Sequence, residues 1–402
     1  MTSTTTARRV ESPTGRRYVQ LVLVLGALIA LGPLTIDMYL PAFPRIREDL
    51  GTTDSAVQLT LTGMLLGLAV GQLVIGPLSD AFGRRRPLVV GICVHATASA
   101  LCALAPTVEV LATVRVLQGF AGAAISVTAM AIVRDLFEGV AVARLMSRLM
   151  LVIGLAPIIA PTLGGLVLQV TTWRGIFVLL GAAALVLVVV AVLGVRETLP
   201  PERRRPATVR SSLAAYRSLL RDRVFVALTF IAGLMLASLF SYVSGASFVL
   251  QDGFGLDAQT FGLVFGLNSA GLTLTSQLNP VMLRWWSVRA VLSGAIVAAF
   301  LASSALLVAG LTGAGLLFVL VPLGLVVATA GLSLPNTPAL ALTRCVQFGV
   351  GALVAPLVGA FGSGTATPMA VVMVTLTVLA GLLMFGVVQR ERTPPLAEVR
   401  PE

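Results

Sequence analysis

The stretch RETLPPERRRPATVRSSLAAYRSLLRDR, residues 196–223, decides the fold, because it is a polar, arginine-rich segment in a chain that is otherwise mostly hydrocarbon. It carries eight arginines against three acids and divides the 402 residues into two halves of similar length. On either side we count six apolar runs of roughly 17 to 25 residues. Each is long enough to cross the ~30 Å hydrocarbon core of a bilayer at 1.5 Å per residue.

The composition excludes a soluble domain with a water-facing surface, since 57% of the residues are hydrophobic and only 11% are charged. No ten-residue alternating pattern suggests a barrel, so the spanning elements should be helices. We predict an all-α membrane protein with twelve transmembrane helices in two six-helix bundles. The predicted helices are 18–41, 55–78, 87–105, 109–133, 144–168, 174–195, 224–247, 259–280, 289–310, 312–333, 345–362 and 367–388.

The domain organisation follows from these spans. We expect an N-terminal tail over 1–17, an N-terminal six-helix bundle over 18–195, a basic linker over 196–223, a C-terminal six-helix bundle over 224–388 and a C-terminal tail over 389–402. The first apolar run is full length and has no small-residue cleavage site, so it should itself act as the insertion signal.

The net charge of +11 has a topological explanation, which makes a nucleic-acid partner unnecessary. Apart from Arg115 inside a span, only Arg45, Arg47 and Arg174 fall outside the loops on the side of the N-terminus. The positive-inside rule then places both termini and the linker in the cytoplasm.

An internal repeat relates the two halves. GLAPIIAPTLGG (154–165) and GVGALVAPLVGA (349–360) share their Gly, Ala-Pro and Gly positions in register. Parallel repeats of this kind build two-domain transporters whose solute site lies between the halves. Arg134 precedes Gly154 by 20 residues, whereas Arg344 precedes Gly349 by five. We therefore expect a shortened helix 11 of about 17 residues, at the lower limit for a span.

The loop GPLSDAFGRRRPL (76–88) is the first candidate functional motif. Its acid could accept hydrogen bonds from a neighbouring helix N-terminus, and its arginines could bond helix C-terminal carbonyls or anionic lipid. A plain positive-inside loop is the simpler interpretation, but topology requires neither the acid nor the glycines. We predict a cytoplasmic gate formed by Gly76, Asp80, Gly83, Arg84 and Arg85.

Asp37 and Arg115 are the candidate proton-coupling residues, because each is an ionisable group inside a span, which costs about 2.5–3.5 kcal/mol on insertion scales. Asp37 lies roughly 6 Å from the outer end of helix 1 and Arg115 roughly 9 Å into helix 4, so they can lie at one level. A static buried ion pair is one interpretation. The other is that desolvation lets Asp37 bind and release a proton, in competition with Arg115 and a drug.

Further polar and aromatic side chains could line a substrate cavity, although helix packing explains each of them equally well. The candidates are Met38, Tyr39, Gln118, Tyr242, Asn268 and Asn336. We interpret His95, the only histidine, as a packed or lipid-facing residue in preference to a proton relay.

The loop motif resembles the signature G-x-L-x-D-R-x-G-R-R of the major facilitator superfamily, with Ala81 in place of the usual arginine. VRVLQGFAGAA (114–124) is similar to that family's helix 4 motif. Residues 154–165 are similar to its antiporter motif, through Gly154, Pro157, Pro161, Gly164 and Gly165. The end of helix 1 and the Trp173-Arg174 entry to helix 6 resemble the Bcr/CflA multidrug efflux branch. The resemblance implies a twelve-helix fold and drug:proton antiport.

The sequence thus predicts a transporter of the cytoplasmic membrane that exports drug-like small molecules in exchange for protons. We expect small-molecule substrates, protons and membrane lipids as partners, a monomer, and no metal or other cofactor. An exporter of a sugar, amino acid or other metabolite is the alternative within transport, and a non-transporting membrane receptor is the alternative outside it. Since no catalytic, metal or phosphate-binding constellation occurs in the sequence, we do not expect an enzyme.

Overall fold

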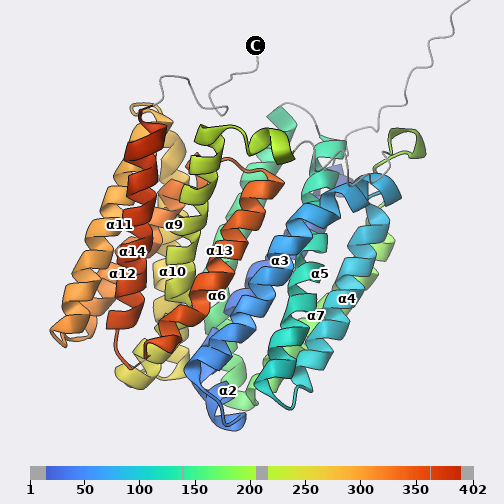
Figure 1. Cartoon of the computed structure of the whole chain (residues 1–402). Coiled ribbons are helices and arrows are strands. Elements are labelled where there is room, and N and C mark those ends of the chain that lie inside the picture. Colours follow the sequence, from blue (N-terminus) through green and yellow to red (C-terminus); the bar gives the residue numbers. More distant parts are fainter. Residues whose placement is uncertain (1–14, 138–139, 205–215, 363, 391–402) are drawn as a thin grey trace, which may run out of the picture.

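The computed structural model describes residues 15–137, 140–204, 216–362 and 364–390, and every named element in those ranges is helical (Figure 1). The first half contains α1 (Gly15–Asp37), η1 (Leu40–Ala42), α2 (Phe43–Asp49), α3 (Asp54–Phe82), α4 (Arg85–Ala103), α5 (Val108–Leu136), α6 (Val140–Val170), α7 (Trp173–Gly194) and η2 (Pro201–Arg203). The second half contains α9 (Arg223–Phe248), η3 (Val249–Gly253), α10 (Ala258–Met282), α11 (Val288–Leu311), α12 (Leu316–Ser333), η4 (Leu334–Asn336), α13 (Ala341–Ala360), α14 (Thr367–Leu383) and η5 (Met384–Val388).

The chain is a multi-pass membrane protein. Within the described ranges, 11 helical segments are long and apolar enough to cross a membrane. Helix α10 has 25 residues but is not among them, because polar side chains such as Asn268, Thr273 and Ser276 lower its hydropathy. It packs against α6 and α12, which are both spanning helices. The tails 1–14 and 391–402 and the linker segment 205–215 lie outside the described residues.

Helix α1 ends at Asp37, four residues before the predicted end at residue 41. Pro41 explains the difference: a proline has no N–H to donate, and its ring collides with the carbonyl four residues earlier, which here belongs to Asp37. The chain continues through η1, with Pro41 at its second residue, into the short α2. Proline chemistry therefore places the Asp37 carboxyl at the C-terminal end of a helix.

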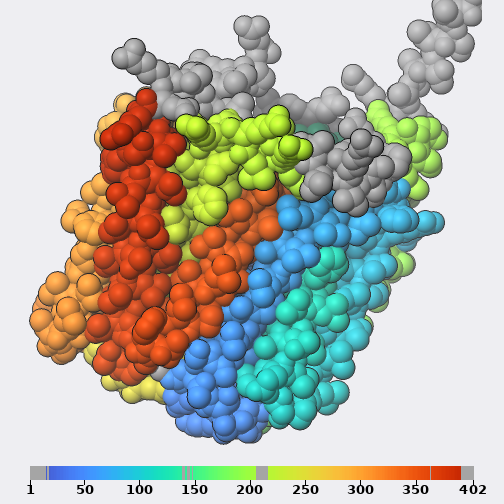
Figure 2. All heavy atoms as spheres, viewed as in Figure 1, coloured from blue at the N-terminus to red at the C-terminus, as the bar shows by residue number. Residues whose placement is uncertain are grey.

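We call the end of the molecule that carries residues 196–204 the linker end, and the opposite end, which carries α2 and η3, the α2 end (Figure 1). Helices α1–α7 form one bundle and α9–α14 the other. The bundles meet where α3 packs against α13 and α6 packs against α10. In the space-filling view the surfaces of α3 (blue) and α13 (orange) touch along this seam (Figure 2).

Hydrogen bonds across the seam close the α2 end. Ser247 donates to the Leu40 carbonyl at 2.7 Å, and Gln58 donates to the Ser244 carbonyl at 3.1 Å. The described cross-bundle hydrogen bonds reach from this end to the middle of α6 and α10, where Thr273 donates to the Gly154 carbonyl at 2.9 Å. Between there and the linker end, none joins described residues of the two bundles. The structure is therefore a state that is shut at the α2 end.

Helix 11, which is α13 here, is shortened as predicted, but it has 20 residues where about 17 were expected, and α12 is short as well. Helix α12 has 18 residues against 29 in α5, and α13 has 20 against 31 in α6. Arg344, the counterpart of Arg134 at the end of α5, lies in the first turn of α13. Because Pro335 and Pro338 interrupt the helix after α12, the residues from Ala341 onward extend α13 to a full ~30 Å span.

Candidate functional site

Asp37 and Arg115 face the interior of the first bundle, as the depth argument requires. Asp37 is 6% exposed and Arg115 is 0% exposed. Arg115 Nη1 donates to the main-chain carbonyl of Thr35 at 3.1 Å, two residues before Asp37. The end of α1 therefore supplies a backbone hydrogen-bond acceptor, the Thr35 carbonyl, to Arg115.

Arg115 is held on three sides. Nη1 also donates to Gln118 Oε1 at 2.7 Å, one turn along α5. The guanidinium carbon lies 4.2 Å from the centroid of the Tyr39 ring and 5.7 Å from that of Phe177. Such cation–π contacts gain strength when they are desolvated, to ~2 kcal/mol or more. The aromatic rings thus compensate part of the cost of burying the charge.

No ion pair joins Asp37 to Arg115 in the described structure, so the static-pair interpretation does not describe this state. The Nε and Nη2 atoms of Arg115 are buried and have no hydrogen-bond partner among the residues that the structure describes. An unsatisfied buried donor is costly, ~1–3 kcal/mol and more for a charged group. An acceptor that reached these two nitrogen atoms would therefore gain a favourable hydrogen bond with Arg115.

Asp37 also lies close to the seam with the second bundle, because Leu40, three residues later, accepts a hydrogen bond at its carbonyl from Ser247 of α9 at 2.7 Å. Tyr242 stacks on Phe265 with ring centroids 4.9 Å apart and accepts a hydrogen bond from Asn268 Nδ2 at 3.2 Å. Tyr242 and Asn268, the candidates from the second half, are thus joined to each other between α9 and α10.

The predicted substrate-cavity residues divide into two groups. Met38, Tyr39, Gln118, Tyr242 and Asn268 are all buried in the interior of the bundles. Asn336 is the exception: it lies at the linker end of α12, where its Nδ2 donates to Asn279 Oδ1 of α10 at 2.7 Å. A cavity-lining role for these residues stays a prediction, and for Asn336 the contact is one of helix packing.

The predicted antiporter motif in α6 provides close helix contacts. A Cβ on Gly164 would lie 1.9 Å from the Met38 carbonyl oxygen, and one on Gly165 would lie 2.8 Å from the Ala258 carbonyl oxygen. A Cβ on Gly154 would meet Thr273 of α10 at 2.8 Å. Pro157 and Pro161 lie inside the same helix. These small residues hold α6 against the end of α1 and against the second bundle.

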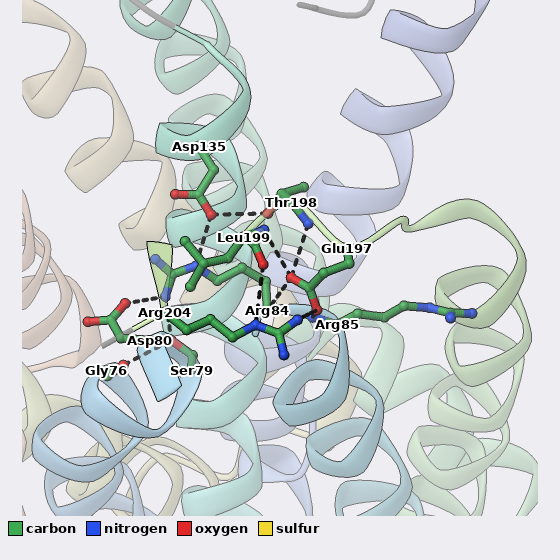
Figure 3. A network of polar contacts seen from close by, with 10 residues as sticks. All are labelled: Gly76, Ser79, Asp80, Arg84, Arg85, Asp135, Glu197, Thr198, Leu199 and Arg204. Atoms are coloured by element: carbon green, nitrogen blue, oxygen red, sulfur yellow. Dashed lines mark hydrogen bonds and ion pairs between the residues drawn. The ribbon is translucent and has the colours of Figure 1, made fainter. Parts of the chain in front are cut away.

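At the linker end, Arg84 organises the predicted gate (Figure 3). Its Nη1 donates to Asp80 Oδ1 at 2.5 Å and to Ser79 Oγ at 2.7 Å, and its Nε donates to Asp135 Oδ2 at 2.9 Å. Burial lowers the pKa of Arg84, but Asp135 and Asp80 outweigh it, so the pKa lies above its ordinary value. Asp80 therefore pairs within its own loop here, and not with the N-terminus of a neighbouring helix.

Glu197, just after α7, ties this loop to the linker segment (Figure 3). Its carboxylate accepts from the backbone N–H groups of Arg84 at 2.8 Å, Arg85 at 3.3 Å, Thr198 at 3.1 Å and Leu199 at 3.0 Å. Burial raises the pKa of Glu197, but the backbone donors and the charge of Arg204 outweigh it and hold the pKa below its ordinary value.

Two glycines and Arg85 complete the gate loop. Gly83 has φ 86° and ψ 169°, a region open essentially only to glycine, and a Cβ there would lie 2.4 Å from Glu197 Oε2. The carbonyl of Gly76 accepts from Ser79 Oγ at 3.0 Å. Arg85 Nη2 donates to the Val192 carbonyl in the last turns of α7 at 2.6 Å, a helix-end carbonyl contact of the kind predicted from the sequence.

Sequence reasoning missed Asp135, Glu197, Thr198 and Arg204 as members of this network. The signal was present: Asp135 and Glu197 are acids at helix ends on the side where arginines predominate. It also missed the partners of His95, which is fully buried among polar side chains.

Comparison with known proteins agrees with this geometry. The sequence profile of the Major Facilitator Superfamily matches residues 25–346. A Bacillus subtilis (strain 168) protein named uncharacterized MFS-type transporter YdgK is 37% identical, over 94% of this chain and 97% of its own. A Haemophilus influenzae protein named bicyclomycin resistance protein homolog is 30% identical, over 92% and 96%.

A solved structure described as a bacterial homolog of the human lysosomal transporter Spinster superimposes with a TM-score of 0.74 at 14% identity. The match covers 94% of this chain and 98% of that one, and it supports the fold. The family points to a transporter and not to an enzyme. The chain belongs to the major facilitator superfamily, and its Haemophilus relative supports a place in the multidrug efflux branch that the loop and helix motifs resemble.

Proposed function

We propose that this protein exports drug-like small molecules across the cytoplasmic membrane in exchange for protons, with both termini and the linker in the cytoplasm. The observation that supports this most directly is Asp37: an acid buried close to the seam between the bundles, unpaired with the Arg115 that its helix contacts through Thr35. The names of the relatives support drug-like substrates over metabolites.

The position of Asp37 favours proton binding in this state. The carboxyl is buried, and it stands at the C-terminal end of α1, where the helix dipole repels negative charge. When the bundles move and water or Arg115 reaches Asp37, the charged form is favoured and the proton leaves. A cationic drug arriving at the seam has the same effect. Proton and drug then compete for one region, which is the minimal requirement for exchange.

The test is flux in proteoliposomes under an imposed pH gradient, with ethidium as the transported probe. The wild-type chain should move ethidium against its gradient, and Asp37→Asn should lose this driven flux while retaining ethidium exchange without a gradient. Glu202→Gln, a change at an exposed acid of the linker segment, is the control and should behave as wild type.

Three outcomes would contradict the proposal. Full gradient-driven flux in Asp37→Asn would remove the proton role from this residue. No flux of any probe would favour a receptor. Flux of sugars or amino acids without flux of ethidium would favour a metabolite exporter.

A further inference from the structure

A closed circuit of hydrogen bonds lies behind Arg115 and joins three helices. The members are Thr35 of α1, His95 and Ser99 of α4, and Arg115 and Gln118 of α5, and all five are 0% exposed. From Gln118 the circuit continues through Nε2, which donates to Ser99 Oγ at 2.8 Å. Ser99 Oγ lies 3.4 Å from His95 Nδ1, and His95 Nε2 lies 3.0 Å from Thr35 Oγ1.

Counting donors assigns the tautomer of His95. The single hydroxyl proton of Thr35 goes to the Leu31 carbonyl at 2.6 Å, so Thr35 Oγ1 can only accept from the imidazole. His95 must therefore carry its proton on Nε2. Ser99 Oγ receives the Gln118 amide and donates to the His95 carbonyl at 2.8 Å, so it has no proton left for Nδ1, and its 3.4 Å contact with Nδ1 is long for a hydrogen bond. The orientation of the Gln118 amide follows in turn, because its oxygen faces Arg115.

The circuit holds the arginine by the same nitrogen that faces α1. Arg115 Nη1 binds Gln118 and the Thr35 carbonyl, and Thr35 is fixed in turn by His95. In this state Nε and Nη2 of Arg115 have no partner among the described residues, and Arg115 forms no ion pair with Asp37 there. The circuit is therefore placed to decide when Arg115 can reach the acid.

We propose that His95, in its neutral Nε2–H form, is a positioning residue that with Thr35 and Ser99 holds Arg115 away from Asp37 in the state shut at the α2 end. This inference rests on the proposed function of Asp37 for its effect on transport, but not for the tautomer. His95 itself passes no proton.

The ionisable groups that the described structure places around this circuit are few. Asp37 and Tyr39 lie at and after the end of α1, Cys102 lies on α4 and Tyr242 on α9, while α7 presents Phe177 to Arg115. Release of Arg115 would therefore act mainly on Asp37, the only acid among them.

The tautomer can be measured directly, because His95 is the only histidine of the chain. Full-length protein with a histidine-free tag and ¹⁵N-labelled histidine in nanodiscs should give one imidazole spectrum, neutral and protonated on Nε2 at pH 7. Thr35→Val removes the acceptor at similar volume and should abolish the preference, and Thr35→Ser should keep it. A proton on Nδ1, or an imidazolium at pH 7, would overturn the assignment.

Transport measurements distinguish a positioning role of His95 from a proton relay and from simple packing. His95→Gln can still donate to Thr35 Oγ1 and should keep ethidium/proton exchange within about twofold. His95→Leu frees Arg115, which favours the charged form of Asp37, and should move the pH midpoint of exchange down by about one unit or more. Equal loss in both variants would indicate a proton relay, and an unmoved midpoint in both would indicate packing alone; either result overturns the proposal.

The two proposals fail in different ways. If Asp37→Asn keeps full driven flux while the ¹⁵N spectrum shows the Nε2–H form, the antiport role of Asp37 falls and the tautomer assignment stands. If Asp37→Asn fails as expected but His95→Leu leaves the pH midpoint in place, only the positioning role falls.

Discussion

Arg47 and Asp252 join the two bundles at the α2 end: Arg47 Nη1 lies 2.7 Å from Asp252 Oδ2, across a separation of 205 residues in the chain. The same nitrogen lies 2.9 Å from Asp54 Oδ1, within its own bundle. The guanidinium carbon also lies 5.8 Å from the centroid of the Phe248 ring in α9. Arg47 Nη2 also lies 3.6 Å from Glu48 Oε1, so this arginine has two acidic partners within its own bundle and Asp252 across the seam.

Asp252→Asn should open the α2 end more often. The pair is partly exposed, so its loss should shift the balance by ~0.5–1 kcal/mol, a two- to fivefold change. The measurement is the rate at which an impermeant maleimide labels a cysteine placed at Ser247, which is fully buried at the seam, with the native cysteines replaced. Asp54→Asn removes a partner within the bundle and is the matched control. Equal rates in both variants would show that the cross-bundle pair does not hold this end shut.

Gly83→Ala should destabilise the protein by about 2–3 kcal/mol, since alanine is strained at this backbone conformation and its Cβ would displace Glu197. Gly313→Ala is the matched control: Gly313 has φ 62° and open space around it, so only the conformational cost, about 1 kcal/mol, should appear. Thermal unfolding in detergent measures both. A Gly83→Ala protein no less stable than Gly313→Ala would argue against the contact with Glu197.

The Glu197 contacts predict a stability difference that depends on pH. Because the folded-state pKa is depressed, the carboxylate stabilises the protein above its ordinary pKa of 4.5, and this contribution is lost as pH falls through the folded value. Wild type should therefore unfold at a higher temperature than Glu197→Gln at pH 7, and the gap should shrink below about pH 4.5. Glu202→Gln, at an exposed position, should show no such gap. A gap that widens on acidification would contradict the assignment.

Helix α13 should span the membrane despite its loss of length, because its 20 residues reach ~30 Å. Single cysteines at Arg203, Gly364 and Arg390 in a cysteine-free chain test this in intact cells. Positions 203 and 390 should be protected from an impermeant maleimide, and 364 should be labelled. Protection at 364 would mean that α13 fails to cross, and labelling at 390 in the same protein would show that α14 still does.

The sequence predicted the helices well because bilayer thickness and charge asymmetry act on long stretches. Eleven of the predicted spans correspond to apolar helices in the structure, and α10 forms as a more polar helix. Asp37 and Arg115 could be identified because an ionisable group in a span is rare. Which atoms they contact could not, since that depends on how α1, α4 and α5 turn toward one another.

Helix ends and the shortened region were predicted less well, for local reasons. The end of α1 depends on one collision between Pro41 and the Asp37 carbonyl, and the predicted end lay four residues beyond it. The missing residues before helix 11 were not expected to affect helix 10, whereas two prolines and the need for a full span distribute the loss over α12 and α13. The Glu197 contacts depend on a loop path set by Gly83, which no hydrophobic periodicity encodes.

The shared shortening of α12 and α13 has a consequence for the opposite conformation. An alternating transporter must at some point seal its other mouth, here the one bordered by the linker. In the second bundle the consecutive helices α12 and α13 are each shorter than their counterparts α5 and α6, so the missing turns cannot contribute to the seal. The second bundle therefore brings fewer helical turns to that barrier than a complete repeat would provide.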